Sequence, residues 1–334
     1  MRELALIEQI RRDFGTSRSR TIALGIGDDC AILRPPIGSE ILVTTDFTLE
    51  GRHFRRNLHP PESVGHRCLA RGLSDLAAMG ATPLSAFLSL ALPADLVSTA
   101  KGRTWITRFF KGLRLLGKEH GITLAGGDTA QSPANVILAD IVLLGAAPVG
   151  KSLRRSDAKP GDAIYVTGAL GGAAAELSAM LTRNAGPGKL PKMGNHPQMF
   201  PEPRVAVGQT LLRRKLATAC IDISDGLSTD LTHLCQSSHV AAELVQAAIP
   251  FHTLARKLNS ATALNAALHG GEDYELLFAA PASIRIPHQL AGVPITRIGQ
   301  FTRRKAGRPP ITLIEPDGKR ATLEPQGWEH FSGR

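Results

Sequence analysis

The chain has 334 residues, of which 43% are hydrophobic and 20% charged, and this length is enough for two domains of ordinary size. No apolar run reaches the roughly 18 residues of a membrane span, and the longest candidate, residues 136–150, contains Asp140. The net charge of +10 favours anionic partners, but aromatic residues make up only 4%, too few to alternate with basic clusters as base-stacking platforms do. We therefore expect neither a membrane segment nor a nucleic-acid partner.

The first 14 residues have the pattern of an amphipathic helix rather than of a signal peptide. Glu3 and Glu8 interrupt any apolar signal core. The apolar residues of the pattern share one stripe: Leu4, Ile7, Ile10 and Phe14. The cysteines, in turn, show no C-x-x-C pairing and no histidine at zinc spacing: Cys30, Cys68, Cys220 and Cys235. Scattered cysteines are typical of reduced thiols, so we expect a cytoplasmic protein.

Strand and helix patterns alternate along the chain, which indicates an α/β or α+β fold. The expected strands are residues 31–33, 40–47, 83–92, 121–127, 134–147 and 163–168, and the expected helices include 61–79 and 98–120. A basic, turn-rich stretch after residue 150 marks a domain boundary. We expect an N-terminal domain over residues 1–150, a C-terminal domain over residues 151–334, and a Gly/Pro-rich loop at 184–201.

Acidic residues recur beside glycines or after strand-like runs. They lie in "GIGDDCAIL", "TTDF", "LSDLAAMG", "GGDT", "DISDG" and "GGEDYE". Strand ends of this kind are where α/β proteins place ligands. Each motif taken alone is also compatible with a turn or a helix cap.

Asp75 is the hardest of these acids to explain as a turn former. It falls in an apolar helical stretch, where a carboxylate is costly unless a cation meets it. Arg71, four residues earlier, fits the solvent face of that helix as easily. Two carboxylates about 4 Å apart repel by about 4 kcal/mol at an effective dielectric of about 20, so a converging set of acids needs divalent cations. All-oxygen ligands favour Mg²⁺ or Mn²⁺ over zinc.

No standard nucleotide-binding motif is present. G-x-x-x-x-G-K-[ST] is absent from the sequence. The stretch "VTGALGGAAAELSAML" has the order strand, glycine-rich turn and helix, so its backbone N–H groups could face an anion. Close packing of the strand on the helix explains the same glycines equally well.

Taken in order, the motifs resemble the thiamine-monophosphate kinase family of the aminoimidazole ribonucleotide synthetase superfamily. The matching stretches are "LGIGDDCAIL", "TTDFTLEGRHF", "LSDLAAMGATP", "LAGGDT", "DAKPGDAIYVTGALG", "IDISDGLSTDL", "GGEDYELLF" and "GWEHF". They run from residue 24 to residue 331, so the resemblance covers essentially the whole chain.

The resemblance implies phosphorylation of thiamine monophosphate to thiamine diphosphate, with ATP as co-substrate and several Mg²⁺ ions. It also implies an aminoimidazole ribonucleotide synthetase-like fold of two α/β domains. In that fold the N-terminal domain binds metal and ATP, and its sheet pairs with that of a second subunit to form a barrel, so a homodimer is expected. The C-terminal α/β domain packs on it.

The resemblance also implies roles for individual residues. Metal ligands would be Asp29, Thr44, Thr45, Asp46, Asp75, Asp128, Asp222 and Asp225. ATP contacts would be Gly127, Asp128, Arg155 and Ser224. Substrate contacts would be His53, Glu272 and Trp328. Phe110 is the nearest aromatic for the nucleotide base, but its position is one residue uncertain and it is not assigned.

The expected reaction is a direct in-line transfer of the γ-phosphate, with no catalytic residue beyond the metal and phosphate ligands. A phosphate monoester has its second pKa near 6, so the acceptor is largely ionised at neutral pH and needs no general base. The alternatives are another enzyme of the aminoimidazole ribonucleotide synthetase type and a non-catalytic nucleotide sensor. His53 could instead be an ordinary loop histidine, and Trp328 a core anchor. Asp28 is expected only to orient its turn.

Overall fold

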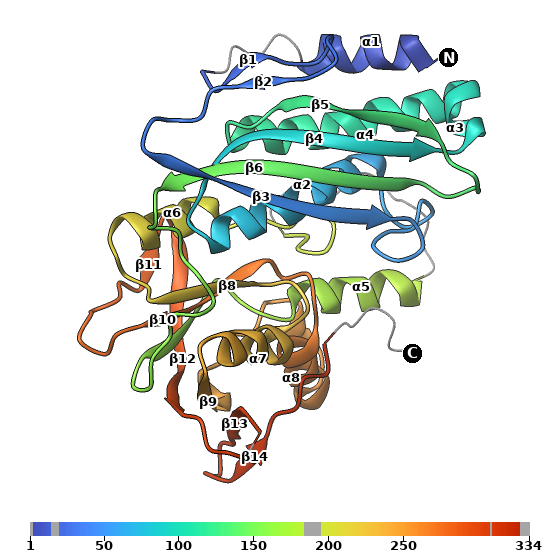
Figure 1. Cartoon of the computed structure of the whole chain (residues 1–334). Coiled ribbons are helices and arrows are strands. Elements are labelled where there is room, and N and C mark those ends of the chain that lie inside the picture. Colours follow the sequence, from blue (N-terminus) through green and yellow to red (C-terminus); the bar gives the residue numbers. More distant parts are fainter. Residues whose placement is uncertain (1–2, 15–19, 184–194, 308, 328–334) are drawn as a thin grey trace. The chain divides into compact units, whose positions relative to one another are not determined.

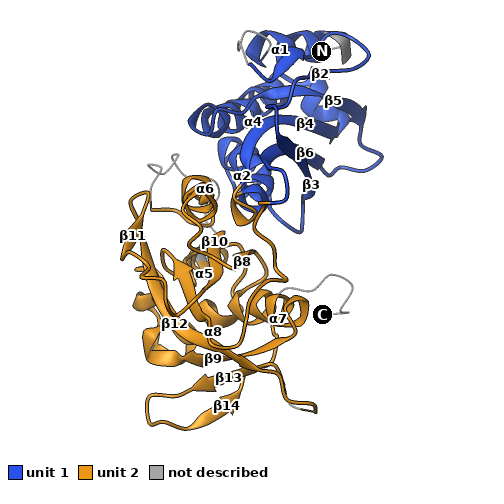
Figure 2. Cartoon of the chain, turned by 60° about the vertical axis from the view of Figure 1, so that its left-hand side comes forward, with its two compact units in different colours: residues 1–76, 81–150, 183–193 blue, residues 77–80, 151–182, 194–334 orange. Residues whose placement is uncertain are grey.

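The structure, a computed structural model, describes residues 3–14, 20–183, 195–307 and 309–327. The chain forms two compact units (Figure 2). The first unit includes residues up to 76 and residues 81–150, and the second includes residues 77–80, 151–182 and the chain from residue 195 onward. The main division follows Gly150, and the short segment 77–80 belongs with the second unit.

The first unit is built on a four-stranded sheet (Figure 1). Its strand order is β3 (Ser39–Leu49), β6 (Leu138–Pro148), β4 (Thr82–Leu92) and β5 (Leu124–Gln131). Only the β4–β5 pair is parallel. The other elements of the unit are α1 (Glu3–Phe14), β1 (Ile22–Leu24), β2 (Ile32–Leu33), α2 (Pro61–Ala78), α3 (Ala94–Ser98) and α4 (Ala100–Glu119).

Helices α2 and α4 approach each other closely because each has a glycine at the crossing. A Cβ on Gly65 of α2 would lie 1.9 Å from the Phe109 carbonyl oxygen, and one on Gly112 of α4 would lie 1.9 Å from the Glu62 carbonyl oxygen. Any larger residue would force the two helices apart. The sequence supplies two small residues where the two backbones meet.

Strand β3 has one buried face and one face that is open to solvent. Leu42 and Thr48 are buried, whereas Ile41, Val43 and Phe47 are 41%, 65% and 57% exposed. Successive side chains of a strand point to opposite faces, so the odd-numbered residues of β3 share the open face. β3 also lies at an edge of the sheet, where one side of its backbone has no strand partner among the described residues.

The second unit contains a larger sheet. Its strand order is β14 (Arg320–Thr322), β13 (Ile311–Ile314), β9 (Val240–Val245), β12 (Val293–Arg303), β7 (Ala163–Thr167), β10 (Glu275–Ala280) and β8 (Ala219–Ile223), with β11 (Gln289–Leu290) beside β12. The β13–β9 pair is parallel, and the other pairs are antiparallel. The helices are α5 (Gly172–Arg183), α6 (Val205–Arg213), α7 (Leu227–Ser237) and α8 (Ser260–His269), with short 3-10 turns at Gln246–Ala248 and Ala255–Lys257.

The core of the second unit lies between its sheet and helices α7 and α8. Ile164 of β7, Ile221 of β8 and Leu277 of β10 are at most 1% exposed and belong to one apolar cluster. Leu231 of α7 and Ala267 of α8 belong to the same cluster. Because these residues alternate with others along each strand, they form one face of the sheet.

The glycine-rich turn before α5 is explained by packing. A Cβ on Gly171 would lie 2.9 Å from the Ala267 backbone nitrogen. The N–H groups of Gly171 and Ala173 donate to the Asp273 carboxylate at 2.6 and 3.1 Å. Asp273 therefore already occupies the position that an external anion would take at this helix N-terminus.

The expected α/β architecture is confirmed, and the helices and strands expected in the first 150 residues are present with small shifts at their ends. The expected helix 98–120 is divided, since α3 ends at Ser98 and α4 begins at Ala100, with Thr99 capping α4 by accepting the Gly102 N–H. Of the expected loop 184–201, residues 184–194 lie outside the described part of the chain. Among the helices described, none is long and apolar enough to cross a membrane.

Asp273 makes the stability of the fold depend on pH. Burial raises the pKa of its carboxyl group to about 7, although the donated N–H groups of Gly171 and Ala173 act in the opposite direction. The pKa is about 3.9 in an unfolded chain, so the folded state binds this proton more tightly. The stabilisation is therefore complete below about pH 4 and is lost as the pH rises to about 7.

We expect wild type to lose stability relative to Asp273→Asn as the pH is raised from about 4 to about 7, because the amide cannot ionise. The measurement is the midpoint of denaturant unfolding of both proteins across that range. If the difference between the two unfolding midpoints stays constant over this pH range, the raised pKa of Asp273 is contradicted.

Candidate functional site

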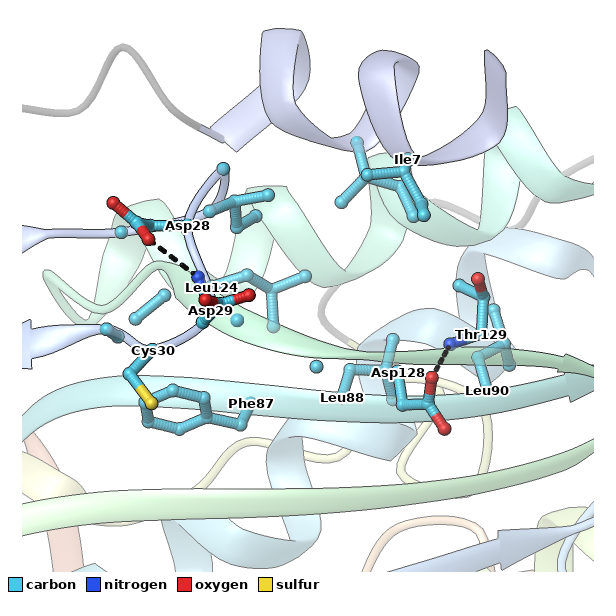
Figure 3. Close-up of a pocket in the computed structure, with 18 of the residues that line it drawn as sticks. Ile7, Asp28, Asp29, Cys30, Phe87, Leu88, Leu90, Leu124, Asp128 and Thr129 are labelled. Carbon is cyan, nitrogen blue, oxygen red and sulfur yellow. Dashed lines mark hydrogen bonds between the residues drawn. The ribbon is translucent and has the colours of Figure 1, made fainter. Parts of the chain in front are cut away.

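A cavity of about 750 Å³ in the first unit carries two of the predicted ligand acids. Asp29 comes from the turn between β1 and β2, and Asp128 comes from β5 (Figure 3). Both residues are exposed. The apolar part of the lining includes Ile7, Ile10, Phe87, Leu88, Leu90, Phe110 and Leu124. A cavity with an apolar wall and a few polar groups has the usual character of a small-molecule site.

The two acidic motifs at this cavity have similar local structures. Asp28 Oδ1 accepts the Asp29 N–H at 2.9 Å, and Asp128 Oδ1 accepts the Thr129 N–H at 2.8 Å (Figure 3). Such bonds are typical of aspartates that shape turns and strand ends. For Asp28 this hydrogen bond agrees with the expectation that its side chain orients the turn. Asp128 keeps a second carboxylate oxygen, so its shaping of the backbone does not exclude ligand binding.

Gly127 is required by the backbone itself. Its φ is 151°, and a Cβ at this position would lie 2.0 Å from the Leu88 carbonyl oxygen of the neighbouring strand. Only glycine fits this approach. The "GGDT" motif therefore brings bare backbone to the cavity wall, directly before the Asp128 carboxylate.

Phe110 and Thr129 are among the cavity residues for which the sequence predicted no role. Phe110 of α4 lines the cavity and packs edge-on against Phe14, with ring centroids 5.9 Å apart. The Thr129 hydroxyl is buried, and none of the described residues hydrogen-bonds to it. The signal for Thr129 was its place in "GGDT". For Phe110 the sequence signal was only its approximate position on a helix.

Asp46 and Asp75 both have partners within the first unit. Arg71 of α2 donates to Asp46 Oδ1 from Nε at 3.1 Å and from Nη2 at 2.9 Å, and both side chains are mostly buried. The Thr44 hydroxyl donates to Asp75 Oδ2. The expectation that Arg71 belongs as easily to the solvent face is wrong, because this guanidinium is only 15% exposed and pairs with Asp46.

Thr45 lies on the opposite face of the sheet from Thr44. Its hydroxyl donates to Asp140 Oδ1 of β6 at 2.7 Å. In the ladder, Asp140 and Asp128 both lie opposite Ser89 of β4, one on each side of it. Residues directly opposite one another in a sheet share a face. Asp140 is therefore a further carboxylate on the face of Asp128, and its sequence signal was an acid within an apolar run.

His53 lies in the turn after β3. Its Nδ1 accepts the Leu49 N–H at 2.9 Å, and its carbonyl oxygen accepts a hydrogen bond from Arg67 Nη2 at 2.8 Å. In the neutral ring the proton is therefore on Nε2, which leaves that atom as a donor. The histidine supports its own turn, as an ordinary loop histidine would, and this does not exclude a ligand contact through Nε2.

In the second unit, the turn after β8 is organised by one buried carboxylate. Asp230 is 3% exposed, and its Oδ2 accepts the N–H groups of Ser224, Asp225 and Gly226 at 3.0, 3.1 and 3.1 Å. Burial, followed by the charges of Asp222 and Asp225, raises the pKa of Asp230 well above its usual range. The three residues of the turn are thereby held in one conformation at the start of α7.

Glu272 lies beside this turn. Its N–H donates to the Ser224 carbonyl oxygen at 2.8 Å, and the Tyr274 N–H donates to that of Ile223 at 2.9 Å. Strand β10 then pairs with β8, with Leu276 opposite Asp222. The structure thus brings four predicted site residues of the second unit together: Asp222, Ser224, Asp225 and Glu272.

The two remaining predicted residues of the second unit are Arg155 and Trp328, and the Arg155 backbone stands apart from that group. The Arg155 carbonyl oxygen accepts a hydrogen bond from Ser238 Oγ at 2.6 Å, which places its backbone at the opposite end of α7 from Ser224. Trp328 lies outside the described residues. The residue before it, Gly327, donates its N–H to Thr229 Oγ1 at 3.1 Å.

The donor chemistry of these residues fits Mg²⁺, although the described residues form no complete protein cage. Within each unit, the described residues include no group of three or more Asp, Glu, His or Cys side chains placed to hold a metal ion. The predicted ligands are carboxylates and hydroxyls, which suit a hard cation. Mg²⁺ usually takes one or two carboxylates and completes its shell with water and substrate phosphates, so separate acids are compatible with it.

Comparison with known proteins identifies the family. Residues 27–150 match the AIR synthase related protein, N-terminal domain, and residues 159–308 match the AIR synthase related protein, C-terminal domain. The thiamine-monophosphate kinase of Escherichia coli (strain K12) is 39% identical over 331 residues, which is 97% of each chain. The chain belongs to the thiamine-monophosphate kinase family.

Solved structures of this family have the same fold. The thiamine-monophosphate kinase from Stenotrophomonas maltophilia K279a superposes with a TM-score of 0.81 at 35% identity, covering 96% of this chain and 98% of that one. AaThiL complexed with AMPPCP and TMP superposes with a TM-score of 0.75 at 29% identity, covering 99% of both chains. The family resemblance inferred from the motifs is confirmed.

Proposed function

We propose that this protein transfers the terminal phosphoryl group of ATP to thiamine monophosphate and so forms thiamine diphosphate. The observation that carries the proposal is the agreement with thiamine-monophosphate kinases over 97% of the chain at 39% identity. A relative of the same fold binds AMPPCP, an analogue of ATP, together with TMP. The chain would thus be a transferase of thiamine biosynthesis.

For ATP, we propose contacts by Gly127 and Asp128 at the first unit's cavity and by Ser224 and Arg155 of the second unit. The bare backbone at Gly127 supports close approach of a ligand. The aromatic rings of Phe87 and Phe110 give that cavity an apolar wall of the kind a purine ring requires.

We propose that several Mg²⁺ ions are held by the carboxylates and hydroxyls predicted from the sequence: Asp29, Thr44, Thr45, Asp46, Asp75, Asp128, Asp222 and Asp225. When bound, Mg²⁺ offsets the charge of phosphate oxygens. The side chains of the protein hold these oxygen donors in position: Arg71 orients Asp46, and Asp230 orients the turn that includes Asp225.

The chain needs no nucleophile of its own for this reaction. The acceptor phosphate is largely ionised at neutral pH and can attack directly. Burial raises the pKa of the Cys68 and Cys235 thiols to about 12 and that of the Cys220 thiol further still, so these three are poor nucleophiles. Placement of the two substrates in line is the task that remains for the protein.

For the thiamine part of the substrate, we propose contacts by His53, Glu272 and Trp328. The Glu272 carboxylate matches the positive charge of a thiazolium ring. His53 Nδ1 accepts the Leu49 N–H, so the proton of the neutral ring is on Nε2. Trp328 offers an aromatic face to the cationic ring.

We also propose a homodimer in which the four-stranded sheet pairs with that of a second copy to form a barrel. Ile41, Val43 and Phe47 expose 41%, 65% and 57% of their surface on one edge strand. An exposed apolar edge strand is a common site of association.

A cytoplasmic location is proposed from the four cysteines, all of which are free thiols.

The activity is tested with purified protein, Mg²⁺ and ATP against a panel of phosphate acceptors. We expect ADP release and thiamine diphosphate formation only with thiamine monophosphate. Turnover of formylglycinamidine ribonucleotide in place of thiamine monophosphate would exclude the proposal.

Replacement of Asp46 or Asp75 by Asn tests the metal ligands. Turnover should fall by about 100-fold or more, because charge is removed where the transferred phosphoryl group needs compensation. Asp46→Asn should also lower the unfolding free energy by about 1–3 kcal/mol, since it removes the ion pair between Asp46 and the Arg71 guanidinium. Asp75→Asn keeps an oxygen for Thr44 and should leave stability nearly level.

The matched control for these variants is Asp28→Asn, which keeps the oxygen that accepts the Asp29 N–H. We expect turnover and stability close to wild type. If Asp75→Asn has unchanged turnover per folded molecule, Asp75 is not a metal ligand.

Light scattering tests the dimer. We expect a mass of twice the 35.6 kDa chain for wild type and a shift toward the single-chain mass for Val43→Lys, which puts a charge into the proposed interface. The matched control is Val245→Lys, since Val245 is 40% exposed in the second unit. A wild-type protein that is monomeric at micromolar concentration would contradict the proposal.

A further inference from the structure

The backbone of Glu272 is held in an unusual conformation. Its φ is 67°, and that of Tyr274 is 50°, both in the left-handed region that non-glycine residues rarely adopt. The Glu272 N–H donates to the Ser224 carbonyl oxygen, and the Tyr274 N–H donates to the carbonyl oxygen of the preceding residue, Ile223. Non-glycine residues in this region persist where the surrounding structure fixes them, and they cluster at functional sites. The backbone of Glu272 is therefore fixed by the turn after β8.

The side chain of Glu272 is held by a second contact, from Gln198. Gln198 Nε2 donates to Glu272 Oε2 at 3.0 Å, and Gln198 itself is 2% exposed. A buried side-chain amide has few other conformations open to it, so this donor remains in place. The two residues are 74 positions apart in the sequence, and no motif connects them.

Gln198 is in turn anchored to helix α5. Its backbone N–H donates to Glu176 Oε2 at 2.8 Å, and Glu176 Oε1 lies 2.5 Å from His196 Nδ1. Glu176 is 7% exposed, so both oxygens of a buried carboxylate are used on this one segment. The Phe200 N–H closes the same segment by donating to the His196 carbonyl oxygen at 2.7 Å.

We propose that Gln198 is a positioning residue that orients the Glu272 carboxylate for the thiamine part of the substrate. This inference rests on the proposed function, in which Glu272 contacts that group. A carboxylate already held in one rotamer loses less conformational freedom when the substrate binds. A neutral amide holds it without cancelling its charge, whereas an arginine or lysine at position 198 would compete with the cationic thiazolium ring.

A merely structural role for this network makes different predictions. If Gln198 only ties the segment 195–200 to α5, its replacement lowers stability and leaves substrate binding per folded molecule unchanged. If Gln198 acts through Glu272, its replacement weakens the binding of thiamine monophosphate specifically and leaves the binding of ATP unchanged. A double-mutant cycle with Glu272 separates the two roles, because residues acting through one another are not additive.

The test uses Gln198→Met, which keeps the length of the side chain and removes the donor. We expect KM for thiamine monophosphate to rise about tenfold, because this is the usual effect of losing one hydrogen bond to a charged group. KM for ATP and kcat should stay within about twofold of wild type. In the background of Glu272→Gln, the same substitution should have little further effect on KM. Gln198→Asn, which shortens the reach of the amide, should reproduce the effect if the Met variant folds poorly.

The matched control is Gln300→Met, since Gln300 Nε2 donates to Glu243 at 3.3 Å on an exposed part of the same unit. Its KM values should equal those of wild type. A raised KM for Glu272→Gln with an unchanged KM for both Gln198 variants would overturn the positioning role and leave the proposed function standing. An unchanged KM for Glu272→Gln would overturn the substrate role of Glu272 and the inference with it. A wild-type protein that does not phosphorylate thiamine monophosphate would overturn the proposed function itself.

Discussion

A carboxylate withdrawn from water has to be met by a donor or a cation, and this constraint governs both units of the molecule. Asp230 is met by three backbone N–H groups, Asp273 by two, and Asp46 by the Arg71 guanidinium. The contacts of Asp230 and Asp46 fix segments that carry candidate ligands. The turns and strand ends of the site are therefore shaped by acids that act on the protein itself.

The same constraint divides the acids into two groups. Asp230 and Asp273 are buried and accept backbone N–H groups, so they serve the fold. Asp29 and Asp128 are exposed at a cavity. An exposed carboxylate beside glycine backbone is accessible to a cation or to a ligand donor. Asp273 and Asp128 thus both come from acidic motifs beside glycine, yet Asp273 serves the fold and Asp128 lies at a cavity.

Glycine contributes to the fold by allowing close approach of backbones. Gly65 and Gly112 let two helices cross, and Gly127 lets a carbonyl oxygen of the next strand lie where a side chain would otherwise be. The glycine-rich turn before α5 belongs to the same class, because Asp273 fills the position at its helix N-terminus. Packing is therefore a sufficient explanation of a motif that resembles an anion site.

Much of this organisation follows from the sequence alone. The alternation of apolar and polar residues determined the strands and helices, since that period reflects which face is buried. The ordered acidic motifs indicated the family, and "GGDT" marked a strand and "DISDG" a turn where candidate ligands gather. Local patterns of this kind can be interpreted because the interactions that produce them span only a few residues.

Only the tertiary structure decided which partner each acid has. Arg71 pairs with Asp46 across 25 residues, Thr45 with Asp140 across 95, and Gln198 with Glu272 across 74. No sequence period connects such residues, because they meet through the packing of a helix on a sheet, the register of two strands, or a segment folded back on a strand end. The physical reason is that a side chain's donor is chosen by distance in space, and the chain's fold sets that distance.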